Sequence, residues 1–219
     1  MNQNHVKELA EYFNITEDQV NANLVTCKKD LSAEYKEKND DYHRISKSVI
    51  YVQMRERPKI DSYLRQIIPQ FFLRGDEKIL DYGCGVGNYS IPLAEAGFDV
   101  TCVEYEDSEI IKFLKWRLKK RYLDDKVKLL GHKDQLPDLY DAVIFYDVLE
   151  HLSDPNDTLT KIHRAMRSRA LLCITSSIHQ GMTDQRIYYE SFGFLYKYFY
   201  KIDQASWVHK IVEWDDRNG

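Results

Sequence analysis

The sequence has few of the features that define secreted, disulfide-rich and membrane proteins. It holds four cysteines in 219 residues, and none of them lies in a Cys-x-x-Cys pair or at another spacing typical of a metal site. Its apolar runs are far shorter than the ~18 residues of a membrane span, and the polar start MNQNHVKEL is not typical of a signal peptide. We therefore expect a cytoplasmic protein with reduced thiols and no membrane partner.

An excess of basic residues is also missing. The chain has 31 Lys and Arg against 35 Asp and Glu, which gives a net charge of −4 and a pI near 6.0. This balance disfavours nucleic acid as a partner. Hydrophobic residues at 43% and charged residues at 30% are typical of globular proteins, and the length fits one domain with or without an elaborated end. No pattern in the chain indicates an oligomeric state.

The first part of the chain contains helical patterns and no strand pattern before residue 78. Apolar residues recur at helical spacing, and Thr16, followed by Asp18 and Gln19, is typical of a helix start. The apolar positions are Val6, Leu9, Ala10 and Phe13, then Val20, Leu24 and Cys27, and then Tyr51, Met54 and Ile60. We predict that residues 1–74 form a helical extension, which either packs against the core or covers a substrate.

From residue 78 onward, short strand-like runs alternate with helical stretches. The runs are KILDY, DVTCVE, KVKLLG, DAVIFY and ALLCIT, and the helical stretches are SIPLAEAG, SEIIKFLKWRLKKRY and TLTKIHRAMRS. This alternation predicts an α/β fold with a doubly wound, mostly parallel sheet, whose site lies at the carboxyl ends of the strands. We place this core in residues 75–219 and expect FLYKYFYKI and WVHKIVEW to close the sheet as an antiparallel hairpin, with DQAS as its turn.

The most informative segment is ILDYGCGVGNYS, residues 79–90. A hydrophobic strand ends in it at Asp81, and Gly83, Gly85 and Gly87 follow at alternate positions before a helix. Glycines permit positive φ angles and let a ligand lie against the backbone, while a helix start offers unpaired N–H groups to a carboxylate or phosphate. An acid at the strand end repels a diphosphate but accepts a hydrogen bond from an ammonium. A ligand with an amino-acid end therefore fits better than a dinucleotide.

The second strand ends in Glu104. An acid at this place can accept both hydroxyls of a ribose, although a lone acid after a strand is also commonly a solvated charge. Tyr105 beside it is placed to lie on an adenine face. A nicotinamide-dependent oxidoreductase uses the same geometry, but it also requires Gly-x-Gly-x-x-Gly, and counted from Gly85 the last position of that motif is Ser90.

Over roughly residues 60–215, the chain resembles the class I S-adenosylmethionine-dependent methyltransferases. The segments LDYGCGVGNYS, AEAGFDVTCVEYE and LPDLYDAVIFYDVLEHLSDP carry the resemblance. It implies a Rossmann-like sheet of seven strands and S-adenosyl-L-methionine as cofactor, with its methionine part at the glycine loop, its ribose at the second strand and its adenine beside the third. The implied cofactor-binding residues are Asp81, Tyr82, Gly83, Gly85, Gly87, Glu104, Tyr105, His132, Lys133, Asp134, Tyr146 and Asp147.

The chain departs from the family pattern at two places. The acid that usually contacts adenine falls on His132, with Asp134 two residues later, so the resemblance leaves open which of the two meets the exocyclic amine. The turn before the fifth strand, within MRSRALLCIT, lacks the usual glycine.

Three titratable residues, Asp147, Glu150 and His151, directly follow the fourth strand. His151, with Asp147 nearby, can act as a general base, because an imidazole titrates near neutral pH. Alternatively, these three residues and His179 bind a divalent ion, as in some quinone and small-RNA methyltransferases with a similar Glu-x-x-Glu-His run, or the run only caps the next helix. We expect no resident metal. The strand also lacks the Asn/Asp-Pro-Pro-aromatic run of adenine and protein-amide methylating relatives, which disfavours a nucleobase acceptor.

The strongest cationic run is KFLKWRLKKR, residues 112–121. On a helix, Ile111, Leu114, Trp116 and Leu118 form an apolar stripe, so the charged side chains are expected to extend into solvent. The alternative is a patch for RNA or another anionic partner, whose binding would depend on salt.

Taken together, these patterns predict a methyltransferase that uses S-adenosylmethionine and acts on an oxygen, nitrogen or carbon atom of a small or medium-sized metabolite. An RNA or protein acceptor is the alternative substrate class. A non-catalytic, cofactor-binding regulatory protein and an NAD-dependent oxidoreductase are the alternatives from other functional classes.

Overall fold

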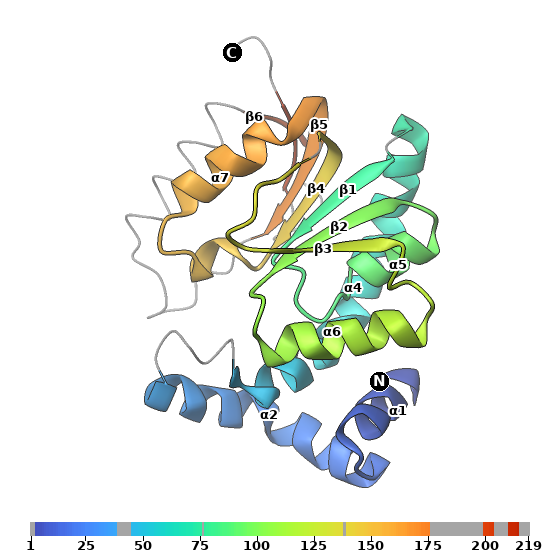
Figure 1. Ribbon diagram of the computed structural model, residues 1–219, viewed down its shortest axis with the longest axis vertical. Coiled ribbons are helices and arrows are strands. Elements are labelled where there is room, and N and C mark those ends of the chain that lie inside the picture. Colours follow the sequence, from blue (N-terminus) through green and yellow to red (C-terminus); the bar gives the residue numbers. More distant parts are fainter. Residues whose placement is uncertain are drawn as a thin grey trace.

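The computed structural model of the protein describes residues 3–38, 45–75, 77–137, 139–175, 199–203 and 210–214. These residues contain a seven-stranded sheet with the strand order β3-β2-β1-β4-β5-β7-β6 (Figure 1). Its strands are β1 (Lys78–Tyr82), β2 (Asp99–Glu104), β3 (Val127–Gly131), β4 (Tyr140–Tyr146), β5 (Met166–Thr175), β6 (Phe199–Asp203) and β7 (Lys210–Trp214). Strands β1 to β5 are parallel, and β7 is antiparallel to both β5 and β6. The predicted doubly wound, mostly parallel sheet is confirmed.

Helices cover both faces of this sheet (Figure 1). Successive residues of a strand point to opposite faces, and Ile79 packs in a core cluster with α4 (Lys47–Arg74), α5 (Ser90–Glu95) and α6 (Glu109–Lys120). Leu80 packs on the other face, in a cluster with α7 (Pro155–Arg164). Because both faces are buried, the strands are almost continuously apolar, as the runs DAVIFY and ALLCIT show.

The amino-terminal helices α1 (Gln3–Phe13) and α2 (Glu17–Lys38) form a further layer, below α6 in Figure 1. Thr16 and Gln19 form a capping box between α1 and α2, because each side chain accepts a hydrogen bond from the other residue's N–H, at 3.2 and 2.9 Å. This confirms the predicted helix start. The buried side chains Leu9, Val20 and Met54 share a cluster with Phe113 of α6.

Helix α4 belongs to two clusters at once. Its first half packs through Ile50 and Met54 against α1 and α2, and its second half packs through Leu64, Ile67 and Phe71 against the sheet. The helical extension over residues 1–74 is therefore continuous with the hydrophobic core, and its division from residues 75–219 stays a prediction. None of the helices in the described ranges is long and apolar enough to cross a membrane.

One predicted helix is too long. TLTKIHRAMRS was expected to be helical throughout, but α7 ends at Arg164 and β5 begins at Met166. The Ala165 carbonyl accepts a hydrogen bond from the Tyr140 N–H at 2.8 Å. Pairing with β4 therefore ends the helix, and the chain continues as a strand. Ala165 has φ −90° and ψ 0°, a conformation open to any residue, which explains why this turn needs no glycine.

The closing hairpin is confirmed where the structure describes it. Strands β6 and β7 pair in an antiparallel register, with Phe199 opposite Trp214 and Tyr200 opposite Glu213. Most of the predicted DQAS turn, from Gln204 onward, lies outside the described residues.

Candidate functional site

Four neighbouring strands end at one edge of the sheet, and each carries a predicted site residue there. Asp81 lies near the end of β1, Glu104 at the end of β2, His132 just after β3 and Asp147 just after β4. The strand order reverses between β1 and β4, because β2 follows β1 on one side and β4 pairs with it on the other. In open α/β sheets, ligands bind outside the carboxyl ends of the strands at such a reversal.

The glycine loop after β1 adopts the conformation that its sequence predicts. Gly83, Gly85 and Gly87 have φ angles of 72°, 54° and 75°, in the left-handed region that side chains disfavour. At Gly85, a Cβ atom would lie 2.4 Å from the Gln53 side-chain oxygen, so a neighbouring helix fills the space that a side chain would need. Glycine at this position thus permits close packing within the protein as well as the turn itself.

The N–H groups of this loop are paired within the protein. Those of Gly83 and Cys84 both donate to the Val103 carbonyl, at 2.9 and 3.1 Å. Those of Gly85, Val86 and Gly87 donate in turn to the Glu104 carboxylate, the Gln53 side chain and the Cys84 carbonyl. These hydrogen bonds fix the conformation of the loop. A ligand therefore has to bind to groups of the loop other than the N–H groups of residues 83–87. The unpaired N–H groups were expected at the helix start behind the loop, and that expectation stays a prediction.

Asp81 is the most deeply buried acid of the site, at 2% exposure. Its carboxylate accepts a hydrogen bond from the Ser90 hydroxyl at the start of α5. Burial raises the pKa of the Asp81 carboxyl to about 7, and the charge of Glu104 adds to this rise, while the hydrogen bonds from Ser90 oppose it. Among the described residues, no cation contributes to the shift of the Asp81 pKa. A buried acid beside a second acid favours a positively charged ligand.

Glu104 is half-buried and joins the end of β2 to the glycine loop that follows β1. One carboxylate oxygen accepts the N–H of Gly85 and the other accepts the N–H of Tyr105, each at 2.9 Å. Burial raises the pKa of the Glu104 carboxyl, and these two hydrogen bonds counter the rise. Since each oxygen has a second lone pair, the carboxylate retains acceptor capacity for hydroxyl groups.

Two rings meet beyond the ends of β2 and β3. The centroids of Tyr105 and His132 are 4.5 Å apart with a tilt of 54° between their planes, and Tyr105 is 37% exposed. Asp134 turns back instead, because its carboxylate accepts the Gly131 N–H at 2.8 Å. His132 therefore lies with Tyr105, whereas Asp134 supports the turn after β3. Lys133, between them, is exposed.

Tyr82 and Tyr146 are side chains of the core in this structure. The Tyr82 ring contacts Phe145 with centroids 5.8 Å apart, and the Tyr146 ring contacts Tyr89 with centroids 4.8 Å apart. Both are at most 8% exposed, and burial raises the pKa of both phenols. Their roles in cofactor binding stay predictions.

Beyond β4, the backbone itself is unusual. Asp147 has a φ of 53°, which is uncommon for a residue with a side chain and is found often at functional sites. Its side chain is exposed, as is that of His151 at the end of the short helix η2 (Leu149–His151). The two predicted catalytic residues thus lie at the same edge as the glycine loop.

The expectation of no resident metal stays a prediction, with a divalent-ion site as its alternative. His179 and the side chain of Glu150 lie outside the part of the chain that the structure describes. Within the described part, no three His, Cys, Asp or Glu side chains are close enough together to hold a metal ion.

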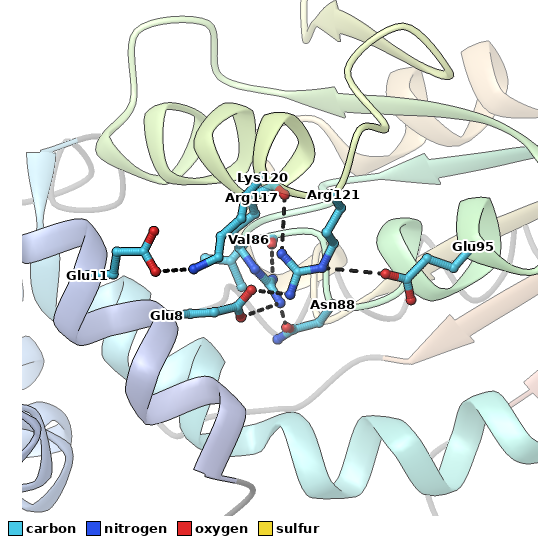
Figure 2. A network of polar contacts seen from close by, with 8 residues as sticks. All are labelled: Glu8, Glu11, Val86, Asn88, Glu95, Arg117, Lys120 and Arg121. Carbon is cyan, nitrogen blue, oxygen red and sulfur yellow. Dashed lines mark hydrogen bonds and ion pairs between the residues drawn. The ribbon is translucent and has the colours of Figure 1, made fainter.

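The cationic run on α6 differs from its prediction. Arg117 was expected in solvent, but it is 1% exposed and bonds to the glycine loop at Val86 and Asn88 (Figure 2). Lys112 and Lys120 pair with Glu109 and Glu11. A cation whose partners lie far away in the sequence leaves no local signal, so only the folded chain reveals the role of Arg117.

Gln53 and Ser90 are further site residues that sequence reasoning did not assign. Gln53 accepts the Val86 N–H, and Ser90 donates to Asp81. Ser90 was noted only because it replaces the last glycine of the dinucleotide motif. Its place at a helix start, nine positions after an acid, was the available signal. Gln53 had none, because it reaches the loop from α4.

Comparisons with known proteins identify the family of this chain. The model of the methyltransferase domain family matches residues 54–207, which is more than half of the chain. A ubiquinone biosynthesis O-methyltransferase of Rickettsia typhi is 31% identical over 103 residues, 45% of this chain and 40% of that protein. One of Yersinia pestis is 33% identical over 84 residues, 36% of this chain and 34% of that protein. The chain thus aligns with well under half the length of these relatives.

Solved structures show the same fold. The PH0226 protein of Pyrococcus horikoshii superposes with a TM-score of 0.56 at 16% identity, over 74% of this chain and 91% of that one. StiE O-MT superposes with the same TM-score and identity, over 71% of this chain and 74% of that one. The chain belongs to the methyltransferase domain family, and its resemblance to the class I S-adenosylmethionine-dependent enzymes is confirmed.

The residues at the strand edge fit the cofactor of this class. S-adenosylmethionine carries a cationic amino-acid end, a ribose diol and an adenine. The described residues offer the buried Asp81 carboxyl, a Glu104 carboxylate that can accept further hydrogen bonds, and the adjoining rings of Tyr105 and His132. The dinucleotide alternative is not supported, because Ser90 is committed to Asp81 and the loop lacks the third glycine of that motif.

Proposed function

We propose that this protein transfers a methyl group from S-adenosylmethionine to a hydroxyl oxygen of a small-molecule acceptor. The observation that carries the proposal is the pair of carboxylates, Asp81 and Glu104, at the carboxyl ends of adjacent strands beside the glycine loop. The two relatives are ubiquinone biosynthesis O-methyltransferases, which supports oxygen as the methylated atom and a small molecule as the acceptor.

Asp81 and Glu104 bind different parts of the cofactor. When bound, S-adenosylmethionine supplies an electrophilic methyl group on its sulfonium sulfur. Asp81 attracts the ammonium group of the amino-acid end, because an ionised carboxylate in a buried site gains strongly from a nearby positive charge. Glu104 accepts the ribose hydroxyls while it holds Gly85, and Tyr105 and His132 provide the surface for adenine.

His151 and Asp147 are proposed to act on the acceptor. A hydroxyl group becomes a better nucleophile when a base takes its proton, and an imidazole near neutral pH is suited to this role. His151 is exposed at the end of η2 and can reach an acceptor from solvent. Asp147 lies four residues before it, and its exposed carboxylate is placed to orient either the imidazole or the acceptor.

The proposal also covers the role of the amino-terminal helices and the location of the protein in the cell. Residues 1–74 act as a helical cap on the core of residues 75–219, which the shared packing of α4 supports. The protein is located in the cytoplasm, which is supported by the state of Cys27, Cys84, Cys102 and Cys173, since all four are buried free thiols.

The test combines cofactor binding with methyl transfer. Titration calorimetry of the purified protein should show binding of S-adenosylmethionine and S-adenosylhomocysteine but not of NAD. Protein incubated with tritiated methyl donor and fractions of a cell extract should label a small molecule whose new methyl group is an ether. Asp81→Ala should abolish both signals. Label in RNA or protein, or cofactor binding without any labelled acceptor, would contradict the proposal.

A further inference from the structure

Two residues of the glycine loop, Val86 and Asn88, are held from outside the loop. The Gln53 side chain on α4 accepts the Val86 N–H at 2.9 Å, and its backbone carbonyl accepts a hydrogen bond from the Asn88 side chain, also at 2.9 Å. From the other direction, one guanidinium nitrogen of Arg117 on α6 donates to the Val86 carbonyl and, at 3.3 Å, to the Asn88 side chain. The loop is therefore clamped between two helices.

Arg117 is itself held by the first helix of the chain. Its second terminal nitrogen lies 3.3 Å from the Glu8 carboxylate, and the side chains of the two residues are only 2% and 6% exposed. Figure 2 shows the Glu8 carboxylate in contact with both Arg117 and Arg121, and Arg117 in contact with Val86 and Asn88. A buried guanidinium needs a balancing charge, and α1 supplies it through this one side chain.

A second ion pair joins the same two helices without reaching the loop. Glu11 on α1 pairs with Lys120 on α6, and these side chains are 56% and 37% exposed. Since solvent screens exposed pairs, this contact contributes little. It lies one helical turn from Glu8, so it provides a matched comparison for the buried contact.

We propose that Glu8 is a positioning residue for the cofactor: through Arg117, it fixes the glycine loop in the shape that binds S-adenosylmethionine. This inference rests on the proposed function and adds a role for α1 that goes beyond packing or covering a substrate. A loop that is already ordered loses less conformational freedom when a ligand binds, so the Glu8–Arg117 contact raises affinity without touching the ligand.

Neutralising Glu8 should release this clamp. In Glu8→Gln, the amide keeps one acceptor oxygen but points an NH₂ group at the guanidinium of Arg117 or Arg121, both of which have only donors. Arg117 then has to seek another acceptor or solvent, and its hold on Val86 and Asn88 weakens. The expected loss in affinity is about tenfold, within the range of coupling between separate sites.

The experiment compares Glu8→Gln with Glu11→Gln. Titration calorimetry with S-adenosylhomocysteine should give a dissociation constant about tenfold higher for Glu8→Gln and within about twofold of wild type for Glu11→Gln. In methyl-transfer assays, KM for S-adenosylmethionine should rise in Glu8→Gln while kcat at saturating cofactor stays the same, a split that general loss of stability would not produce. Equal affinity in wild type and Glu8→Gln, or equal losses in both variants, would overturn the inference.

Hydrogen exchange in the wild-type protein provides a test that requires no variant. Coupling is reciprocal, so if α1 favours cofactor binding, then bound S-adenosylhomocysteine must stabilise the docking of α1. Amides of residues 3–13 should exchange more slowly at saturating S-adenosylhomocysteine than without it. Unchanged exchange in α1, together with slowed exchange in the glycine loop, would refute the inference alone. If calorimetry detected no binding at all, the proposed function would fall and this inference with it.

Discussion

The carboxylate of Glu104 accepts a hydrogen bond from the backbone N–H of Gly85, with 2.9 Å between the two atoms. One side chain thus joins the end of β2 to the glycine loop that follows β1. The same carboxylate also accepts the Tyr105 N–H, so it fixes the residue that is placed beside adenine. The shape of the loop therefore depends on the same acid that we propose to bind the ribose.

Removing the charge of Glu104 should weaken cofactor binding. In Glu104→Gln, an amide replaces the carboxylate that holds Gly85, and a charge-assisted hydrogen bond contributes about 1.5–3 kcal/mol. We expect the dissociation constant for S-adenosylhomocysteine, measured by calorimetry, to rise by about tenfold or more. Asp99→Asn is the control, because Asp99 is an exposed acid at the opposite end of β2. Similar affinities in the two variants would remove Glu104 from the site.

The buried carboxyl of Asp81 should make stability depend on pH. Its pKa is about 7 in the folded protein against 3.8 ordinarily, so the folded state holds a proton that the unfolded state has lost. Because the folded state binds more protons in this window, the free energy of unfolding should decrease as pH rises from about 4 to about 7, by up to ~4 kcal/mol. Urea unfolding at several pH values measures this slope. In Asp81→Asn the slope should be smaller, and an identical slope would contradict the assignment.

Cofactor binding should release a proton from Asp81. At pH ~7 about half of the Asp81 carboxyls are protonated, and a cationic ligand end nearby lowers the pKa and expels that proton. Calorimetry with S-adenosylhomocysteine in two buffers of different ionisation enthalpy should detect about half a proton released per molecule bound. Asp81→Asn should show a smaller release. Equal heats in both buffers for the wild-type protein would mean that the ligand's cationic end lies elsewhere.

A side chain at Gly85 should destabilise the protein. A Cβ atom there would lie 2.4 Å from the Gln53 side-chain oxygen, at a φ of +54°. Strain at positive φ costs ~1–2 kcal/mol, and the clash adds to it, so we expect Gly85→Ala to lower the free energy of unfolding by ~2–3 kcal/mol.

Gly75→Ala is the matched control for Gly85→Ala, because its φ is +72° but nothing lies within 4 Å of the added atom. Urea unfolding should show a smaller loss for Gly75→Ala. Adding Gln53→Ala to Gly85→Ala should recover the part of the loss that comes from the clash. If the two glycine variants lost equal stability, the contact with Gln53 would have no effect.

His151 should determine the pH dependence of methyl transfer. If it is the general base, His151→Ala should lower kcat by ~10²-fold or more and remove the rise in rate near neutral pH. Affinity for S-adenosylhomocysteine should stay at the wild-type value, which separates catalysis from binding. A pH–rate profile with the wild-type shape in His151→Ala would show that another group, or none, takes the proton.

Most strands and the carboxylate positions could be predicted from the sequence because their signals are local. KILDY and DVTCVE are buried runs that end in acids, and the alternate glycines after Asp81 require a particular backbone wherever they occur. The end of α7 could not be predicted, because nothing in TLTKIHRAMRS stops a helix. There, the pairing of Tyr140 with Met166 outweighs helix propensity.

The sequence by itself determined the α/β fold, the family and the edge of the sheet at which we propose that the ligand binds. These follow from short-range periodicity and from residues that lie close together in the sequence. Only the tertiary structure decided what holds that edge in place. Gln53 meets Val86 across 33 positions, and Glu8 meets Arg117 across 109. A charge whose partner lies so far along the chain resembles any solvated charge until the helices pack, because its low-dielectric surroundings exist only in the folded state.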